Sequence, residues 1–344
     1  MDDRIDRRGA RDRGPRWSVG VGLIVIALGF AACSAVASPS PALSPSTGPE
    51  TLAEKDIASG VDKLMAPGVL DVYWPAAPGP WPVAVMFHGG GVNKSYLSPH
   101  AEKVAQLGYV VFVPNHGFSG SAAYDALLMS EQEELSTAQA ACAVAFAAQE
   151  APKYGGDPKR ITVFGHSAGA NEAAMVTFKN PGPSAGCFAD TKATAKVLIA
   201  WEGDWLWAGT PSFTDPVHAS DPAMFDAITP WAHIASRPDL RVIILESEDN
   251  GLGRDAKDAL GPKGWLTLRD PSGAFTAAFK AMGAFDDGNL SLHEWQTVLA
   301  DRLKASGNLV SFDIMPDTNH DTYMSTAGWE VFLDAFKRAA ALAS

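Results

Sequence analysis

From about Leu52 onward, the chain alternates short apolar runs with longer segments in which apolar positions recur every three or four residues. The short runs are rich in β-branched and aromatic residues and nearly free of charge. That composition is typical of strands buried on both faces of a parallel sheet covered by helices. The runs are PVAVMF (82–87), YVVFVP (109–114), RITVF (160–164), KVLIAW (196–201), RVIILE (241–246) and LVSFDIM (309–315).

Helices are predicted between these strands. Ser98-Pro99 supplies a cap and a proline at the first position of one helix, and Gly108 closes it. Two further helices have apolar stripes at helical spacing: Leu135, Ala138, Cys142 and Ala145, and then Trp329, Phe332, Phe336 and Ala340. The alternation predicts an α/β fold with a doubly wound, mostly parallel sheet of about eight strands. A chain of 344 residues, 47% of them hydrophobic, is long enough for one such domain, expected over residues 52–344.

The N-terminal 32 residues differ from the rest. Six arginines in residues 1–16 precede an uncharged stretch, VGVGLIVIALGFAAC, which is typical of a secretion signal and short for a membrane span. Its end, Phe30-Ala31-Ala32-Cys33, resembles a bacterial lipobox, in which the cysteine is lipidated and becomes the mature N-terminus. We therefore expect a signal peptide over 1–32 and an exported protein anchored to the outer face of the cell membrane through Cys33. An ordinary cleaved signal ending near Ala37, and hence a secreted protein, is the alternative.

Residues 33–51 are rich in Ser and Pro and are expected to form an extended tether. The net charge of the chain is −12, and without residues 1–32 the balance is 21 Lys/Arg against 35 Asp/Glu. No basic cluster with interleaved aromatic residues occurs after the signal, which argues against nucleic-acid binding. An acidic domain on a tether is expected to meet the membrane only through its lipid anchor.

The candidate chemistry starts at Ser167, which stands between Gly165 and Gly169 in ITVFGHSAGANEAAMV (161–176). The serine falls where an apolar strand ends and a helix begins, and the two glycines lack the Cβ atoms that would clash in so abrupt a turn. Such a turn presents the hydroxyl at the first turn of a helix, where N–H groups are free. Two strands earlier, His88-Gly89-Gly90-Gly91 follows Phe87, and its glycines let backbone N–H groups approach a ligand closely.

Together, HGGG, LGYVVFVPN and YGGDPKRITVFGHSAGA resemble the esterase/lipase branch of the α/β-hydrolases, over roughly residues 67–344. The resemblance implies a serine hydrolase that cleaves carboxylic esters through an acyl-enzyme. It implies that Ser167 is the nucleophile and that the N–H groups of Gly90, Gly91 and Ala168 form the oxyanion hole. The base comes last in this family, and His320 lies in the loop after the last predicted strand.

The acid of the triad is expected just past the strand at 241–246, where the sequence reads ESEDNGLGRD. Family members often read G-x-x-D at this point, and Glu246-Ser247-Glu248-Asp249 matches that pattern with Glu in place of Gly. Asp249 is therefore the predicted acid, with Glu248 as the alternative.

If Cys33 is lipidated, Cys142 and Cys187 remain as an even pair in an oxidising setting, and a disulfide between them is expected. No metal-ligand cluster is visible, and the triad needs no cofactor. Residues 252–290 resemble an insertion and are a candidate lid over a small-molecule ester substrate. An acyltransferase or a peptidase on the same fold is the main alternative, and a non-catalytic binding protein is a further one.

Overall fold

The structure is a computed structural model. It describes residues 48–60, 68–117, 126–127, 129–183, 186–203, 205, 227–250, 253–255, 277, 280–281, 283, 289–320 and 324–342, all within the compact unit Leu43–Ser344. The expected signal peptide, Cys33, most of the tether and most of the candidate lid at 252–290 lie outside these residues. Of the helices that are described, none is long and apolar enough to cross a membrane.

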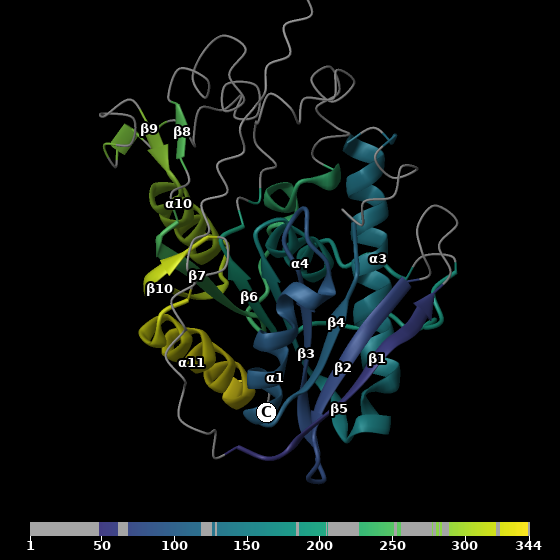
Figure 1. Ribbon diagram of the computed structural model, residues 1–344. Helices are drawn as coiled ribbons and strands as arrows, with labels where there is room; N and C mark the ends of the chain where they lie inside the picture. The colour runs from purple at the N-terminus through teal and green to yellow at the C-terminus, as the bar shows by residue number, and fades with distance from the viewer. Residues whose placement is uncertain are drawn as a thin grey trace, which may run out of the picture. The chain divides into compact units, whose positions relative to one another are not determined.

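An eight-stranded sheet forms the centre of the fold (Figure 1), as the alternating pattern predicted. Its strands are β1 (Thr51–Gly60), β2 (Gly68–Pro75), β3 (Trp81–Phe87), β4 (Val110–Pro114), β5 (Gly156–His166), β6 (Val197–Trp201), β7 (Arg241–Asp249) and β10 (Leu309–Asn319). They lie in the order β1-β2-β4-β3-β5-β6-β7-β10. Every neighbouring pair from β4 to β10 is parallel, so the carboxyl ends of these strands meet at one edge.

The first two strands are antiparallel additions that the apolar runs did not reveal. Strand β2 pairs antiparallel with both β1 and β4. Strand β1 is an edge strand whose first six residues are exposed or half-buried, so it lacks the continuous apolar run of a central strand. Its register shifts between Glu54 and Ile57, which marks a β-bulge.

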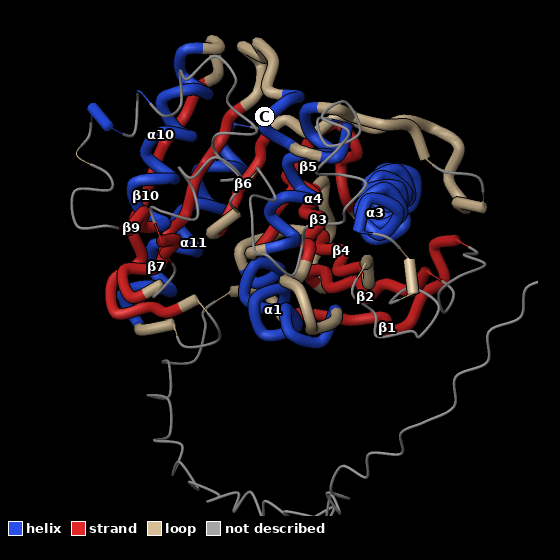
Figure 2. The backbone as a smooth tube through the Cα atoms, turned by 90° about the horizontal axis from the view of Figure 1, so that it is seen from above, coloured by secondary structure: helices blue, strands red, loops and turns tan. Residues whose placement is uncertain are grey.

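Helices cover both faces of the sheet. Helix α3 (Met129–Glu150), α4 (Ala168–Phe178) and α10 (Leu292–Ala305) pack on one face, with strand residues such as Val83, Val85 and Phe87. Helix α1 (Ser98–Gln106) and α11 (Thr326–Leu342) pack on the other face, with the alternate strand residues Ala84 and Met86. The view from above shows α1 and α3 on opposite sides of β4 (Figure 2). The predicted α11 stripe is confirmed in that Phe332 and Phe336 are fully buried.

Smaller elements complete the described chain. The 3-10 turns are η1 (Lys94–Leu97), η2 (Ala151–Tyr154) and η4 (Pro230–His233), and β8 (Gly253–Asp255) pairs antiparallel with β9 (Asn289–Ser291). Helix α10 begins with a capping box between Ser291 and Glu294.

The predicted disulfide forms between Cys142 of α3 and Cys187, whose Cα atoms are 5.5 Å apart. Cys187 also makes an isolated antiparallel bridge with Gly60 at the end of β1. The bond therefore fixes the chain that follows α4 against α3 and the edge of the sheet.

Candidate active site

Ser167 occupies a strained turn between β5 and α4. Its φ of 54° and ψ of −121° belong to a region that residues with a Cβ rarely adopt. The flanking glycines make the turn possible: a Cβ on Gly165 would lie 2.0 Å from the carbonyl oxygen of Gly169, and one on Gly169 would lie 2.3 Å from that of Phe87. The predicted sharp turn from strand to helix is thus present, and the helix packs against the end of β3.

Three side chains form a chain of hydrogen bonds from this turn. His320, directly after β10, places Nε2 3.1 Å from Ser167 Oγ. Its other ring nitrogen, Nδ1, lies 2.5 Å from Oε2 of Glu202. With the proton on Nδ1 donated to the carboxylate, Nε2 has a free lone pair and accepts the hydrogen bond of the serine hydroxyl.

Glu202 follows β6 directly and is held in one orientation. Its side chain has no exposed surface, and its φ is 56°. Oε1 accepts a 2.7 Å hydrogen bond from the backbone N–H of Ser247 on β7. The Ser247 hydroxyl accepts from Trp201 Nε1 and donates to the carbonyl oxygen of Asn319, beside His320. Strands β6, β7 and β10 are therefore tied together behind the histidine.

The predicted acid, Asp249, does not take this position. Asp249 is exposed at the end of β7, and the alternative, Glu248, is exposed as well and accepts from the backbone N–H of Asp317. Glu246, which is buried, forms a hydrogen bond with His293 rather than with His320. The correction has a simple cause: His320 Nδ1 faces the end of β6, one strand nearer to Ser167 than the end of β7.

The glycine loop after β3 lies over the serine turn. A Cβ on Gly89 would lie 3.4 Å from Ser167 Cβ, and one on Gly90 would lie 3.7 Å from Ala168 Cβ. Ala168 is the first residue of α4, where an N–H group has no acceptor four residues back in its helix. The structure thus brings Gly90 and Ala168 to the same place as Ser167, as expected, and Gly91 follows at the exposed tip.

Three other histidines surround the turn and are held neutral. Burial lowers the pKa of His88 to about 4. Burial, with the nearby His88, lowers the pKa of His116 well below its usual range. Burial, followed by repulsion from His320 and His100, does the same to His166. Among these imidazoles, His320 is the one that contacts the serine hydroxyl.

His166, Glu202 and His320 could also hold a metal ion, since one ligand atom from each lies within 4.8 Å of the others. Within the described part of the chain, however, His320 is already bonded through both ring nitrogens, to Ser167 and Glu202. Metal binding there would break the connection between histidine and carboxylate. The expectation that no metal or cofactor is needed stays a prediction.

Comparisons with known proteins bear on the fold. Residues 70–200 match the model of the family described as BD-FAE, a family of α/β-hydrolase esterases. No curated protein matches the chain in sequence.

Solved structures of esterases share its fold. Esterase B from Lactobacillus rhamnosis, inhibited by a tributyrin phosphonate, has a TM-score of 0.59 and 14% identity, with 87% of this chain and 88% of that chain covered. Esterase 2 from Thermogutta terrifontis with bound butyrate has a TM-score of 0.54 and 18% identity, with coverage of 85% and 91%. The same esterase phosphonylated by sarin gives 0.55 and 18%, with coverage of 85% and 92%. The serine turn, the mostly parallel sheet and these likenesses lead to one conclusion: the chain has the α/β-hydrolase fold.

Proposed function

We propose that the protein is a serine hydrolase that cleaves carboxylic esters, with Ser167 as nucleophile, His320 as base and Glu202 as the acid of the triad. The observation that carries the proposal is the continuous hydrogen-bond chain from Ser167 Oγ through His320 to the buried carboxylate of Glu202. A nucleophile, a base and a group that orients the base, each within hydrogen-bond reach of the next, are the parts that acyl transfer requires.

The proposed reaction has two halves, formation and hydrolysis of an acyl-serine. Nε2 of His320 takes the proton of Ser167 while Oγ attacks the ester carbonyl carbon. The carbonyl oxygen becomes negative, and the N–H groups of Gly90, Gly91 and Ala168 donate to it. His320 then returns the proton to the departing alcohol, which leaves an acyl-serine. Water, deprotonated by His320, releases the acid and restores the serine.

Glu202 has a supporting part in this cycle. The hydrogen bond from Nδ1 keeps the histidine in the tautomer whose Nε2 accepts a proton. The carboxylate also stabilises the imidazolium that forms in each half of the reaction. The Ser247 N–H, which donates to the other oxygen, holds the carboxylate in the orientation this role requires.

The comparisons favour an ester with a short acyl chain. The similar structures include an esterase with bound butyrate and one inhibited by a tributyrin phosphonate. We also propose, on the sequence pattern alone, that a lipid on Cys33 anchors the domain outside the cell membrane through the Ser/Pro-rich tether. Radiolabelled palmitate incorporated into wild type and absent from Cys33→Ala tests the anchor.

A substrate panel tests the activity. p-Nitrophenyl esters of increasing acyl length should be hydrolysed, the shorter ones best, and Ser167→Ala should lower turnover by several orders of magnitude. Matched anilides and a peptide substrate distinguish a peptidase, and added alcohol acceptors that capture most of the acyl group distinguish a transferase. Hydrolysis that persists in Ser167→Ala would contradict the proposal.

A further inference from the structure

The oxyanion loop, residues 88–93, has little packing to hold its tip. Gly90 and Gly91 are exposed. A Cβ on Gly91 would find no atom of the described chain within 4 Å, and the φ of this glycine is +74°. Donors stabilise an oxyanion only if they are fixed before the reaction. The loop must therefore be held at its ends.

The entry to the loop is held by a buried histidine. His116 Nε2 donates to the carbonyl oxygen of His88 at 3.1 Å, and the two rings stack with their centroids 4.2 Å apart. His116 is fully buried, and its Nδ1 lies 3.4 Å from Ser136 Oγ of α3. The loop therefore leaves β3 from a fixed point.

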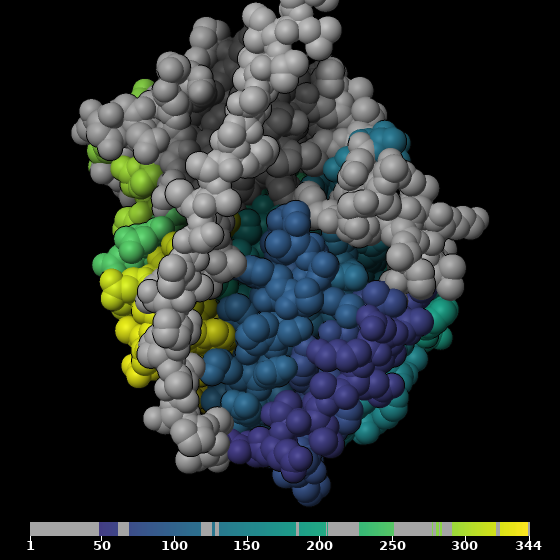
Figure 3. Space-filling view, in the orientation of Figure 1, coloured from purple at the N-terminus to yellow at the C-terminus, as the bar shows by residue number. Residues whose placement is uncertain are grey.

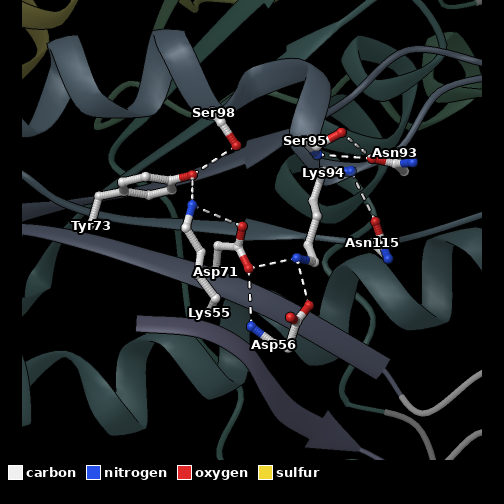
Figure 4. A network of polar contacts seen from close by, with 9 residues as sticks. All are labelled: Lys55, Asp56, Asp71, Tyr73, Asn93, Lys94, Ser95, Ser98 and Asn115. Carbon is white, nitrogen blue, oxygen red and sulfur yellow. Dashed lines mark hydrogen bonds and ion pairs between the residues drawn. The ribbon is translucent and has the colours of Figure 1, made fainter. Parts of the chain in front are cut away.

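The exit is held by a group of polar contacts that we call the anchor network (Figure 4). It joins β1, β2 and the end of β4 to η1 and the start of α1. Its members are Lys55, Asp56, Asp71, Tyr73, Asn93, Lys94, Ser95, Ser98 and Asn115.

Asp71 of β2 is the centre of the network. Its side chain is only 3% exposed, yet it lies 2.6 Å from Lys94 Nζ and 3.2 Å from Lys55 Nζ. It also accepts from the backbone N–H of Asp56 at 3.1 Å. Burial would raise the pKa of Asp71, but the hydrogen bonds from Lys94, Asp56 and Lys55 outweigh it and hold the pKa below its usual value. A carboxylate buried in this way keeps its donors in place because losing one leaves a desolvated charge.

The bulge in β1 explains how neighbouring residues reach one carboxylate. Side chains of consecutive strand residues normally point to opposite faces, but the register shifts between Glu54 and Ile57. Lys55 and Asp56 can therefore both face the network, and Asp56 Oδ1 lies 2.8 Å from Lys94 Nζ. Strand β1, purple in Figure 3, lies at the surface there, and the Asp56 side chain is 73% exposed.

Two further contacts fix the backbone of the exit. The backbone N–H of Lys94 donates to Asn115 Oδ1 at 2.8 Å, and Asn93 caps η1 by accepting from the N–H of Ser95 at 2.9 Å. A third contact links β2 to the start of α1: the Tyr73 hydroxyl donates to Ser98 Oγ at 2.7 Å. Lys94 is thus held through its main chain and its side chain, three residues after Gly91.

We propose that Asp71 and Lys94 are positioning residues for the oxyanion hole. Their ion pair, in which Asp71 is buried and Lys94 partly buried, fixes the exit of the loop and thereby the N–H groups of Gly90 and Gly91. The inference rests on the proposed ester hydrolysis, and it assigns a function to two strands that lie away from Ser167, His320 and Glu202. Because the donors bind the oxyanion more strongly than the substrate carbonyl, their displacement lowers kcat and leaves KM nearly unchanged.

The test compares Asp71→Asn and Lys94→Met with a matched control, Glu54→Gln. Glu54 is also an acid near the bulge of β1 and pairs with Lys153 at 3.5 Å, away from η1. A displaced donor should lower kcat by about 10- to 100-fold in both network variants, with KM within about twofold of wild type. The affinity for an alkyl boronic acid, which mimics the tetrahedral intermediate, should fall with kcat. Glu54→Gln should match wild type, and Lys94→Arg should recover part of the loss.

A folding defect is separated from a positioning defect by hydrogen exchange. Peptides spanning 88–94 should exchange faster in Lys94→Met, while peptides from β5 and α4 keep wild-type protection. Unchanged kcat in both network variants, or a loss explained by the unfolded fraction alone, would overturn the inference and leave the proposed function standing. A wild-type protein that hydrolyses no ester, with Ser167 unreactive, would overturn both.

Discussion

Replacing Glu202 by glutamine tests the hydrogen bond between His320 Nδ1 and Glu202. This bond makes Glu202 the acid of the triad in place of Asp249, which the sequence predicted. The carboxylate accepts from two donors, the Ser247 N–H at 2.7 Å and His320 Nδ1 at 2.5 Å. A glutamine has one oxygen and one NH2 group, so it can accept from one of the two donors and must donate toward the other position. Because the backbone N–H of Ser247 cannot rotate, the glutamine oxygen accepts from it, and the glutamine NH2 group then faces His320.

An amide NH2 beside Nδ1 makes that nitrogen the acceptor and moves the proton to Nε2. A protonated Nε2 cannot take the proton of Ser167. The equivalent change from acid to amide in a serine protease triad lowers turnover by about 10⁴, and a factor of that size raises the activation barrier by about 5 kcal/mol. The variant should fold normally because the side chains have the same shape and no unpaired charge is created.

The assay is hydrolysis of a short-chain p-nitrophenyl ester by Glu202→Gln, with Asp249→Asn as the matched control. Asp249 is exposed at the end of β7, so its amide should keep turnover within about twofold of wild type. Thermal unfolding of both variants shows whether the fold is retained. Near wild-type turnover in Glu202→Gln with a large loss in Asp249→Asn would refute the reasoning.

Three further predictions concern stability. Gly169→Ala would place a Cβ 2.3 Å from the Phe87 carbonyl oxygen and should destabilise the fold by about 1–3 kcal/mol or more in urea unfolding, whereas Gly182→Ala, with open space around its Cβ, should not. The Cys142–Cys187 bond closes a loop of sequence separation 45. Replacing both cysteines by alanine should therefore cost up to about 4 kcal/mol in the same assay, and a cost near zero would contradict the constraint. Burial raises the pKa of Glu172 from 4.5 to about 7, so the folded protein holds a proton that the unfolded chain releases, and stability falls as pH rises through that window. Glu172→Gln should remove that fall, and an unchanged pH dependence of the melting temperature would show that another group causes it.

The sequence predicted what depends on local pattern. Apolar runs identified the central strands because strands covered on both faces need apolar residues at every position. Ser167 was recognisable because its turn requires glycine on both sides, and His320 because it follows the last strand directly. The disulfide was predictable because, with Cys33 set aside for lipidation, Cys142 and Cys187 are the two cysteines that remain.

The acid was missed because several carboxylates stand at one edge of the sheet. Glu202 directly follows β6, and Glu246, Glu248 and Asp249 lie in the last four residues of β7, so sequence position alone does not choose among them. The choice depends on the direction in which His320 Nδ1 points and on the Ser247 N–H that holds the carboxylate. A glutamate directly after an uncharged buried strand, before Gly203, was the available signal.

The anchor network was equally hidden. Asp71 and Lys94 meet across 23 residues, and Lys55 and Asp56 reach them only because β1 is bulged. No local pattern encodes a contact of that kind. The antiparallel strands β1 and β2 could not be recognised as uncharged apolar runs. Strand β1 is largely exposed, and β2 contains Asp71.

The most direct measurement of the central claim is labelling by a fluorophosphonate, followed by peptide mass spectrometry. Nucleophilic attack by Ser167 requires the hydrogen bond to His320 and an intact turn, so one phosphonyl group should be found on the peptide that contains GHSAG. Labelling should be lost in Ser167→Ala and strongly slowed in His320→Ala and Glu202→Gln. An adduct on another residue, or full labelling of Ser167→Ala, would contradict the account.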